Sequence, residues 1–122
     1  MTTPKRILLA DDDPRDQELT VMALSEYRRA NEIMMVNDGV EALDYLLRRD
    51  KFAGLPAGNP AILLLDLKMP KVDGLGVLRE IRKTPALWLL PVVILTSSRQ
   101  EADVAESYNL GASGYVVKPV DF

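Results

Sequence analysis

The segment from Ile62 to Asp66 constrains the fold of this chain more than any other. Four consecutive apolar residues, Ile62 to Leu65, end in Asp66 and are followed by a loop that contains Pro70. An apolar run without polar alternation is typical of a central parallel strand that helices cover on both faces. Aspartate is unfavourable within strands and costly to bury, so a carboxylate at this place indicates a site. The alternative is a turn, in which Asp66 ends the strand by bonding nearby backbone amides.

Short apolar runs and segments of helical periodicity alternate along the rest of the chain. The runs that we expect to form strands are Lys5–Ala10, Ile33–Val36, Ile62–Leu65, Val92–Leu95 and Tyr115–Val117. The expected helices are Pro14 to about Ala30, Val40–Leu47, Gly74–Lys83 and about Gln100 to Leu110. In the first of these, the apolar residues at helical spacing are Leu19, Met22, Ala23 and Tyr27. Strict alternation predicts right-handed βαβ units, and therefore an α/β fold with a parallel sheet in one domain over residues 1–122.

Three connections carry their own predictions. The segment Asp50–Pro60 contains two glycines and two prolines, so we expect an exposed connector without regular structure. Gly111 stands where a left-handed residue would end the last helix. Trp88 lies in an apolar turn, where it serves either packing or a surface contact.

Composition excludes several kinds of chemistry. The chain has no cysteine and no histidine, which excludes disulfides, thiol catalysis and a serine–histidine triad. The net charge is −3 with scattered lysine and arginine, so nothing indicates a nucleic-acid partner. No apolar stretch is long enough to span a bilayer, and the N-terminus does not resemble a signal peptide. We therefore expect a cytoplasmic domain with no membrane partner that works with carboxylates, hydroxyls, lysine and a hard cation.

Candidate site residues follow four of the five predicted strands. Ligands of open parallel sheets bind beyond the carboxyl ends of the strands, so these residues form one constellation. They are Asp11, Asp12 and Asp13 after the first strand, Asp66 after the third, Thr96 and Ser97 after the fourth, and Lys118 after the fifth. Clustered carboxylates repel one another unless a proton or a cation neutralises them, and Mg²⁺ prefers such oxygen ligands.

This constellation suits phosphoryl chemistry. An aspartate beside Mg²⁺ can attack phosphorus, while a lysine and a threonine hydroxyl stabilise charge on the phosphoryl oxygens. The alternative for Asp11 to Asp13 is a helix N-terminus, where carboxylates complement the helix dipole. We assign that structural function to Asp13, and a metal-binding function to Asp11 and Asp12.

Four sequence segments make the chain similar to a known family. ILLADDDP, LLLDLKMPKVDG, VVILTSS and GASGYVVKP occur in this order, each at its own predicted strand. Together they resemble the receiver domain of two-component response regulators over essentially the whole chain. The connector Asp50–Pro60 and the ending SYNLGASGYVVKPVDF resemble stand-alone regulators that pair with phytochrome-type or similar sensor kinases.

The resemblance implies a flavodoxin-like, doubly wound sheet with the strand order 2-1-3-4-5. It implies that Asp66 is the phospho-acceptor and that Mg²⁺ or Mn²⁺ binds Asp11, Asp12, Asp66 and the backbone carbonyl of Lys68. It further implies that Thr96 is the switch hydroxyl, that Lys118 binds phosphate, and that the rotamer of Tyr115 reports activation. Packing within the sheet is the alternative for Tyr115.

Two departures from the family pattern stand out. Ser97 occupies a position where many members carry alanine, which adds a hydroxyl beside the phosphate site. The chain also stops at Phe122, where the family's fifth helix would begin. Without that helix, one flank of the sheet near the fifth strand would be uncovered. Either the sequence is truncated, or another chain covers this surface.

The resemblance implies a phosphorylation-activated switch rather than an enzyme. It would accept a phosphoryl group from a sensor histidine kinase or a phosphotransfer protein, catalyse only its own phosphorylation and dephosphorylation, and signal by contact with a protein target or by homodimerisation. One alternative is a Mg²⁺-dependent phosphohydrolase with an aspartyl nucleophile, but Lys68 stands where such enzymes carry a second carboxylate. Another is a docking module without phosphate, which the complete acidic and lysine set disfavours. A GxxxxGK[ST] phosphate loop is absent from the sequence, so a nucleotidase or kinase is weaker still.

Overall fold

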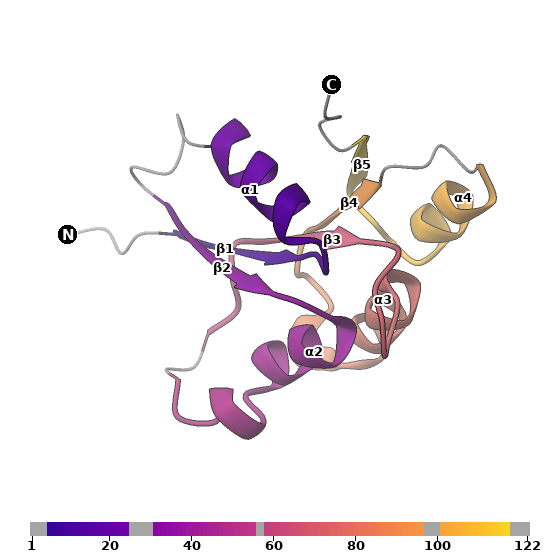
Figure 1. Cartoon of the computed structure of the whole chain (residues 1–122). Helices are drawn as coiled ribbons and strands as arrows, with labels where there is room; N and C mark the ends of the chain where they lie inside the picture. The colour runs from indigo at the N-terminus through magenta and orange to yellow at the C-terminus, as the bar shows by residue number, and fades with distance from the viewer. Residues whose placement is uncertain (1–4, 25–30, 56–57, 97–100, 118–122) are drawn as a thin grey trace.

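The described part of the chain forms a five-stranded parallel sheet with helices on both faces (Figure 1). The structure is a computed structural model that describes residues 5–24, 31–55, 58–96 and 101–117. The strands are β1 (Lys5–Ala10), β2 (Asn31–Val36), β3 (Ile62–Asp66), β4 (Val92–Thr96) and β5 (Gly114–Val117). The helices are α1 (Pro14–Ala23), α2 (Gly39–Leu47), α3 (Gly74–Lys83) and α4 (Glu101–Asn109), with single 3₁₀ turns η1 (Asp50–Phe52) and η2 (Pro85–Leu87). The strand order β2-β1-β3-β4-β5 confirms the predicted doubly wound α/β fold.

Strand register brings the carboxyl ends of the strands to one edge of the sheet. Ala10 at the end of β1 pairs with both Val36 and Leu65. Asp66 at the end of β3 pairs with Leu95 on β4. Residues that follow β1 and β3 therefore leave the sheet side by side, as the sequence predicted.

The core lies between the sheet and the helices α2 and α3. Side chains alternate along each strand, and Leu63, Leu65 and Ile94 all point into this layer, fully buried. The amphipathic helix α3 adds Val77 and Ile81, also fully buried. Removing this apolar surface from water is the main stabilising term of the fold.

The opposite face of the sheet is covered less completely. Helix α1 lies on this face (Figure 1), where Leu9 on β1 is fully buried. Toward the far edge, Leu64 and Val93 are only partly buried, and Val116 on β5 is 51% exposed. Strand alternation and register place these four side chains on the same face. Within the described residues, the flank near β5 is thus open.

The long connector contains more structure than its composition predicts. Our expectation of no regular structure over Asp50–Pro60 is wrong for Asp50–Phe52, which form the turn η1. Phe52 is 5% exposed and packs edge-on against Tyr45, with ring centroids 5.2 Å apart. The glycines and prolines all come after Phe52, so burial of this one ring organises the start of the segment.

The ends of two helices test further expectations. Helix α1 ends at Ala23 with Leu24 as its C-cap, and residues 25–30 of its predicted extent lie outside the described residues. Gly111 has φ +86°, and the amides of Gly111 and Ala112 donate to Tyr108 O and Ser107 O. This is the predicted left-handed helix end. Trp88 is 58% exposed, which favours the surface alternative for this residue over packing.

Arg82 on α3 joins two connections at the edge of the sheet opposite the carboxyl ends of the strands. Its guanidinium donates to Trp88 O (2.7 Å) and Leu90 O (3.5 Å) in the connection before β4. It also donates to Leu110 O (2.8 Å) and Gly111 O (3.0 Å) at the end of α4. A single planar cation therefore satisfies four carbonyl groups that helix ends and turns leave without a partner.

We expect the variant Arg82→Met, which keeps most of the aliphatic stem, to unfold more easily. Loss of the donors should lower the free energy of unfolding by about 1–3 kcal/mol, because the part-buried bonds to Leu90 O and Leu110 O are lost. Urea denaturation measures this change. The neighbouring variant Lys83→Ala, which loses only an exposed ion pair with Glu80, should change the free energy by less than about 0.5 kcal/mol. Equal effects of the two variants would contradict this interpretation of Arg82.

Candidate functional site

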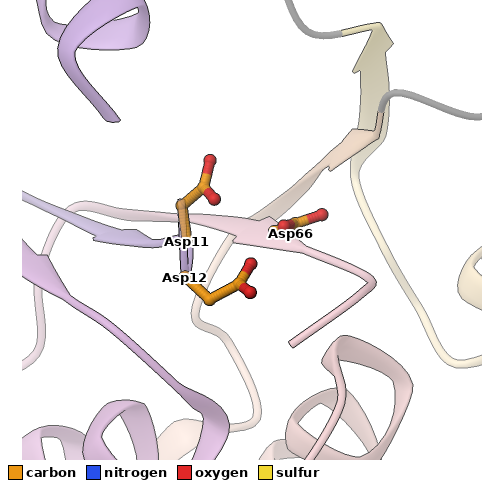
Figure 2. A group of neighbouring side chains, drawn as sticks. All are labelled: Asp11, Asp12 and Asp66. Atoms are coloured by element: carbon orange, nitrogen blue, oxygen red, sulfur yellow. The ribbon is translucent and has the colours of Figure 1, made fainter. Parts of the chain in front are cut away.

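Three carboxylates meet beyond the ends of β1 and β3 (Figure 2). One carboxylate oxygen from each of Asp11, Asp12 and Asp66 lies within 4.8 Å of the other two. Asp11 is fully buried and Asp66 is 5% exposed, whereas Asp12 is exposed to solvent. The predicted meeting of these three side chains is thus present in the structure.

Asp66 is held by the strand that it ends and by the loop that follows. The amide of Lys68 donates to Asp66 Oδ1 at 3.3 Å, and the amide of Gly74 donates to Leu67 O at 2.9 Å. Gly74 is the first residue of α3 and packs directly on this strand end. A Cβ atom at Gly74 would lie 2.3 Å from Asp66 O and 2.7 Å from Leu67 Cα. Only glycine therefore lets α3 begin this close to Asp66.

The three aspartates of the loop after β1 lie in two different surroundings. Asp13 Oδ1 accepts from the amides of Arg15 (2.9 Å) and Asp16 (3.4 Å), so Asp13 is the N-cap of α1, as predicted. Asp11 Oδ1 accepts from the amide of Asp13 at 3.0 Å, which bends the loop back on itself. Asp11 and Asp12 remain on the side of Asp66.

The donor set of this cluster fits a hard divalent cation. Three carboxylates this close repel one another, and two of them are shielded from water. Mg²⁺ and similar ions bind carboxylate and carbonyl oxygens and keep several waters, which the exposed side of Asp12 accommodates. Asp11, Asp12 and Asp66 are the residues that would hold such an ion.

The remaining predicted site residues fall in three groups. Thr96 ends β4 and pairs with Val117, one position beyond the partner of Asp66. Tyr115 on β5 is 43% exposed, and its ring meets that of Tyr108 on α4 edge-on, with centroids 6.2 Å apart. Lys118 and Ser97 lie outside the described residues.

Sequence reasoning missed two residues beside the site. Tyr108 faces Tyr115 because the reversal at Gly111 returns the chain from α4 to β5, and the glycine was the available signal. Gln17 was missed because the apolar spacing in α1 pointed elsewhere. The described α1 buries Gln17 and Thr20, whereas Met22 is 63% exposed. A polar residue that interrupts an apolar face gives no periodicity signal.

Comparisons with known proteins agree with this geometry. The family model of the response regulator receiver domain matches residues 7–122. This chain belongs to that family. Response regulator Rcp1 of Synechocystis sp. is 38% identical over 115 residues, which are 94% of this chain and 77% of Rcp1.

Solved receiver structures are similar over nearly the whole chain. The bacteriophytochrome response regulator RtBRR is 54% identical with a TM-score of 0.87, over 97% of this chain and 71% of RtBRR. The Mn²⁺-bound form of Rcp1 is 37% identical with a TM-score of 0.88, over 98% and 84%. The phosphorylated cyanobacterial phytochrome response regulator RcpA is 38% identical with a TM-score of 0.87, over 96% and 82%. The predicted resemblance to stand-alone, phytochrome-associated regulators is confirmed.

Within the residues that the structure describes, no helix has the length and apolar character needed to cross a membrane.

We expect Gly74→Ala to disturb the strand end that carries Asp66. The new methyl group would overlap backbone atoms that cannot move freely, so the free energy of unfolding should fall by about 2–3 kcal/mol. Gly54→Ala is the matched control, because a Cβ atom there would meet nothing within 4 Å. Chemical denaturation compares the two variants, and a Gly74→Ala protein as stable as the Gly54→Ala protein would refute the close approach.

We expect Asp12→Asn to stabilise the metal-free protein. The substitution removes one of three repelling charges, so the free energy of unfolding in EDTA should rise by about 0.5–1 kcal/mol at low ionic strength and by less at high ionic strength. Asp13→Asn removes a charge from the same loop but keeps the helix cap, and it should not stabilise the protein. Thermal denaturation at both ionic strengths measures the stability of the two variants. Equal changes in stability would argue against a repelling cluster.

Proposed function

We propose that this receiver domain, taken as residues 1–122, is a phosphorylation-activated switch in which Asp66 accepts the phosphoryl group. The observation that carries the proposal is the position of Asp66. Its carboxylate ends the central strand, is 5% exposed, and lies within 4.8 Å of the carboxylates of Asp11 and Asp12. A relative of similar fold, RcpA, has a phosphorylated form.

The cofactor of this proposal is Mg²⁺ or Mn²⁺. Asp11, Asp12, Asp66 and the backbone carbonyl of Lys68 would hold the ion, in agreement with the Mn²⁺-bound form of the related Rcp1. When bound, the ion offsets the negative charge of the carboxylates and of the phosphoryl oxygens, which allows an anionic donor to approach.

The transfer step uses Asp66 as a nucleophile. A carboxylate oxygen of Asp66 attacks the phosphorus of a phosphohistidine, and the phosphorus–nitrogen bond breaks with its electron pair remaining on the imidazole. The product is an acyl phosphate on Asp66. Thr96 and Lys118, which follow β4 and β5, would stabilise the phosphoryl oxygens. Attack of water on the acyl phosphate returns the free carboxylate, so the domain acts only on itself.

The output would be a change in protein contacts. Thr96 ends the strand beside β5, and Tyr115 on β5 already contacts Tyr108 on α4 through partly exposed rings. Phosphorylation that moves Thr96 would change this aromatic pair and the surface around it. A downstream protein or a second copy of the chain would recognise that surface. The named relatives RtBRR and RcpA favour a phytochrome-type sensor kinase as the phosphoryl donor. We propose the cytoplasm as the place of this transfer.

The phosphohydrolase alternative has less support. Such enzymes typically carry a second carboxylate two residues after the nucleophile, where a general acid can protonate a leaving group. Lys68 occupies that position, is exposed, and contributes its amide to Asp66.

We expect incubation with acetyl phosphate and Mg²⁺ to add one phosphoryl group, seen in the intact mass, that hydrolyses slowly. The adduct should be lost in Asp66→Asn and kept in Asp73→Asn, because Asp73 lies in the same loop but only caps α3. Rapid turnover of phosphoesters without an adduct would instead favour the hydrolase. A folded protein with neither adduct nor turnover would contradict the switch and favour a docking module that works without phosphate.

A further inference from the structure

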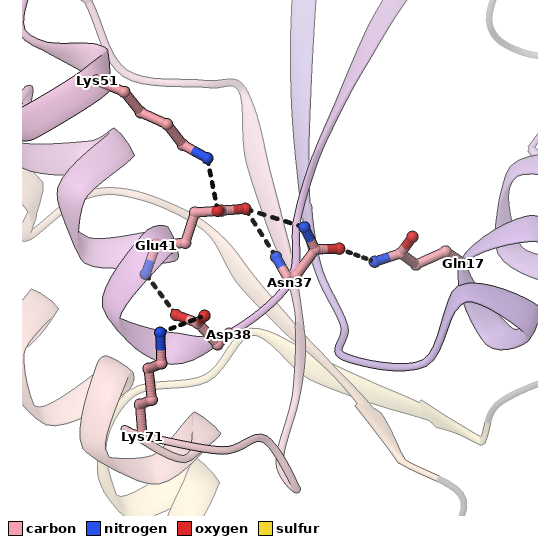
Figure 3. A network of polar contacts seen from close by, with 6 residues as sticks. All are labelled: Gln17, Asn37, Asp38, Glu41, Lys51 and Lys71. Atoms are coloured by element: carbon pink, nitrogen blue, oxygen red, sulfur yellow. Dashed lines mark hydrogen bonds and ion pairs between the residues drawn. The ribbon is translucent and has the colours of Figure 1, made fainter.

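Gln17 is a buried polar residue with a specific pair of acceptors. It lies on α1, is 8% exposed, and its Nε2 donates to the backbone carbonyl of Asp11 at 2.5 Å. The same nitrogen donates to Asn37 Oδ1 at 2.8 Å (Figure 3). One side-chain amide thus connects the loop after β1 with the loop after β2.

These contacts fix the backbone on both sides of Asp11. The amide of Asp11 donates to Val36 O at 3.1 Å, which holds the peptide plane before Asp11. Gln17 holds the carbonyl of Asp11, and with it the peptide plane that leads to Asp12. Because peptide groups are planar, fixing these two planes leaves Asp11 little torsional freedom. The direction in which Asp11 and Asp12 leave the strand is then set from outside their loop.

Asn37 is itself oriented by a charged network (Figure 3). Its backbone amide and Nδ2 donate to Glu41 Oε1 at 2.9 and 3.4 Å, so its Oδ1 is turned toward Gln17. Glu41 Oε2 accepts from Lys51 Nζ at 2.8 Å, and this hydrogen bond raises the pKa of Lys51 above its ordinary value. Lys51 therefore stays charged beside Glu41 at neutral pH.

We propose that Gln17 is a positioning residue that sets the affinity of the Asp11–Asp12 pair for a divalent cation, with Asn37 and Glu41 orienting its amide. The inference rests on the proposed function, because it concerns the cation of that same site. A side chain that only fills buried space would affect folding stability alone. A positioning residue also affects cation binding in the folded protein, as partners of metal-binding groups do.

The test compares Mn²⁺ affinity and metal-free stability in four proteins. Gln17→Met keeps the length of the side chain but has no donor. Asn37→Ala removes the second acceptor at an exposed position, so it should fold even if Gln17→Met does not. Thr20→Val is the matched control on the same helix, because the Thr20 side chain is 5% exposed and its hydroxyl has no hydrogen-bond partner among the described residues.

We expect the dissociation constant of Mn²⁺, measured from the electron paramagnetic resonance signal of free Mn²⁺, to rise about tenfold in Gln17→Met and less in Asn37→Ala. Thr20→Val should bind Mn²⁺ like the wild type. Unfolding in EDTA reports stability separately for each variant. If Gln17→Met folds, wild-type Mn²⁺ affinity in both Gln17→Met and Asn37→Ala overturns this inference but leaves the proposed function standing. If Gln17→Met does not fold, wild-type Mn²⁺ affinity in Asn37→Ala has the same consequence. Absence of Mn²⁺ binding in the wild type overturns the metal site and the inference together.

Discussion

Parallel pairing of β1 with β3 is the interaction on which the site depends. The ladder that joins Ala10 to Leu65 places Asp11 and Asp66 one residue beyond the same point of the sheet. A slip of one residue would turn every side chain of β3 to the other face. Leu63 and Leu65, which are fully buried beneath α2 and α3, oppose such a slip. The hydrophobic core thus holds the strand register that sets the spacing of Asp11 and Asp66.

Clustered charges and tight packing coexist at this edge of the sheet. Gly74 lets α3 begin against the carbonyl of Asp66, and Asp13 begins α1 just beyond Asp12. Both helices therefore point their N-terminal ends, where the helix dipole is positive, at the carboxyl edge. The backbone offsets part of the repulsion among the three carboxylates, and an ion would offset the rest.

The fold and the acidic cluster followed from the sequence for a simple reason. In a parallel sheet, the residue after an apolar run must emerge at a shared edge, so Asp11 and Asp66 could be placed together without coordinates. Burial inside α1 could not be predicted this way. Leu19 and Met22 suggested an apolar face, yet the buried residues of the described α1 are Gln17 and Thr20. Of these two, Gln17 hydrogen-bonds to the loops after β1 and β2. The burial of Phe52 was not predicted either, because the glycines and prolines after it dominated the composition of its segment.

The four carbonyls gathered by Arg82 have a mechanical consequence for α4. They fasten the C-terminal end of this helix to α3 and to the connection before β4. A helix held at one end moves as a lever, so the largest displacement falls on its first turn. That turn begins after β4, at the edge of the sheet where the carboxylates lie. A tilt of α4 about this anchor would therefore displace the start of the helix most.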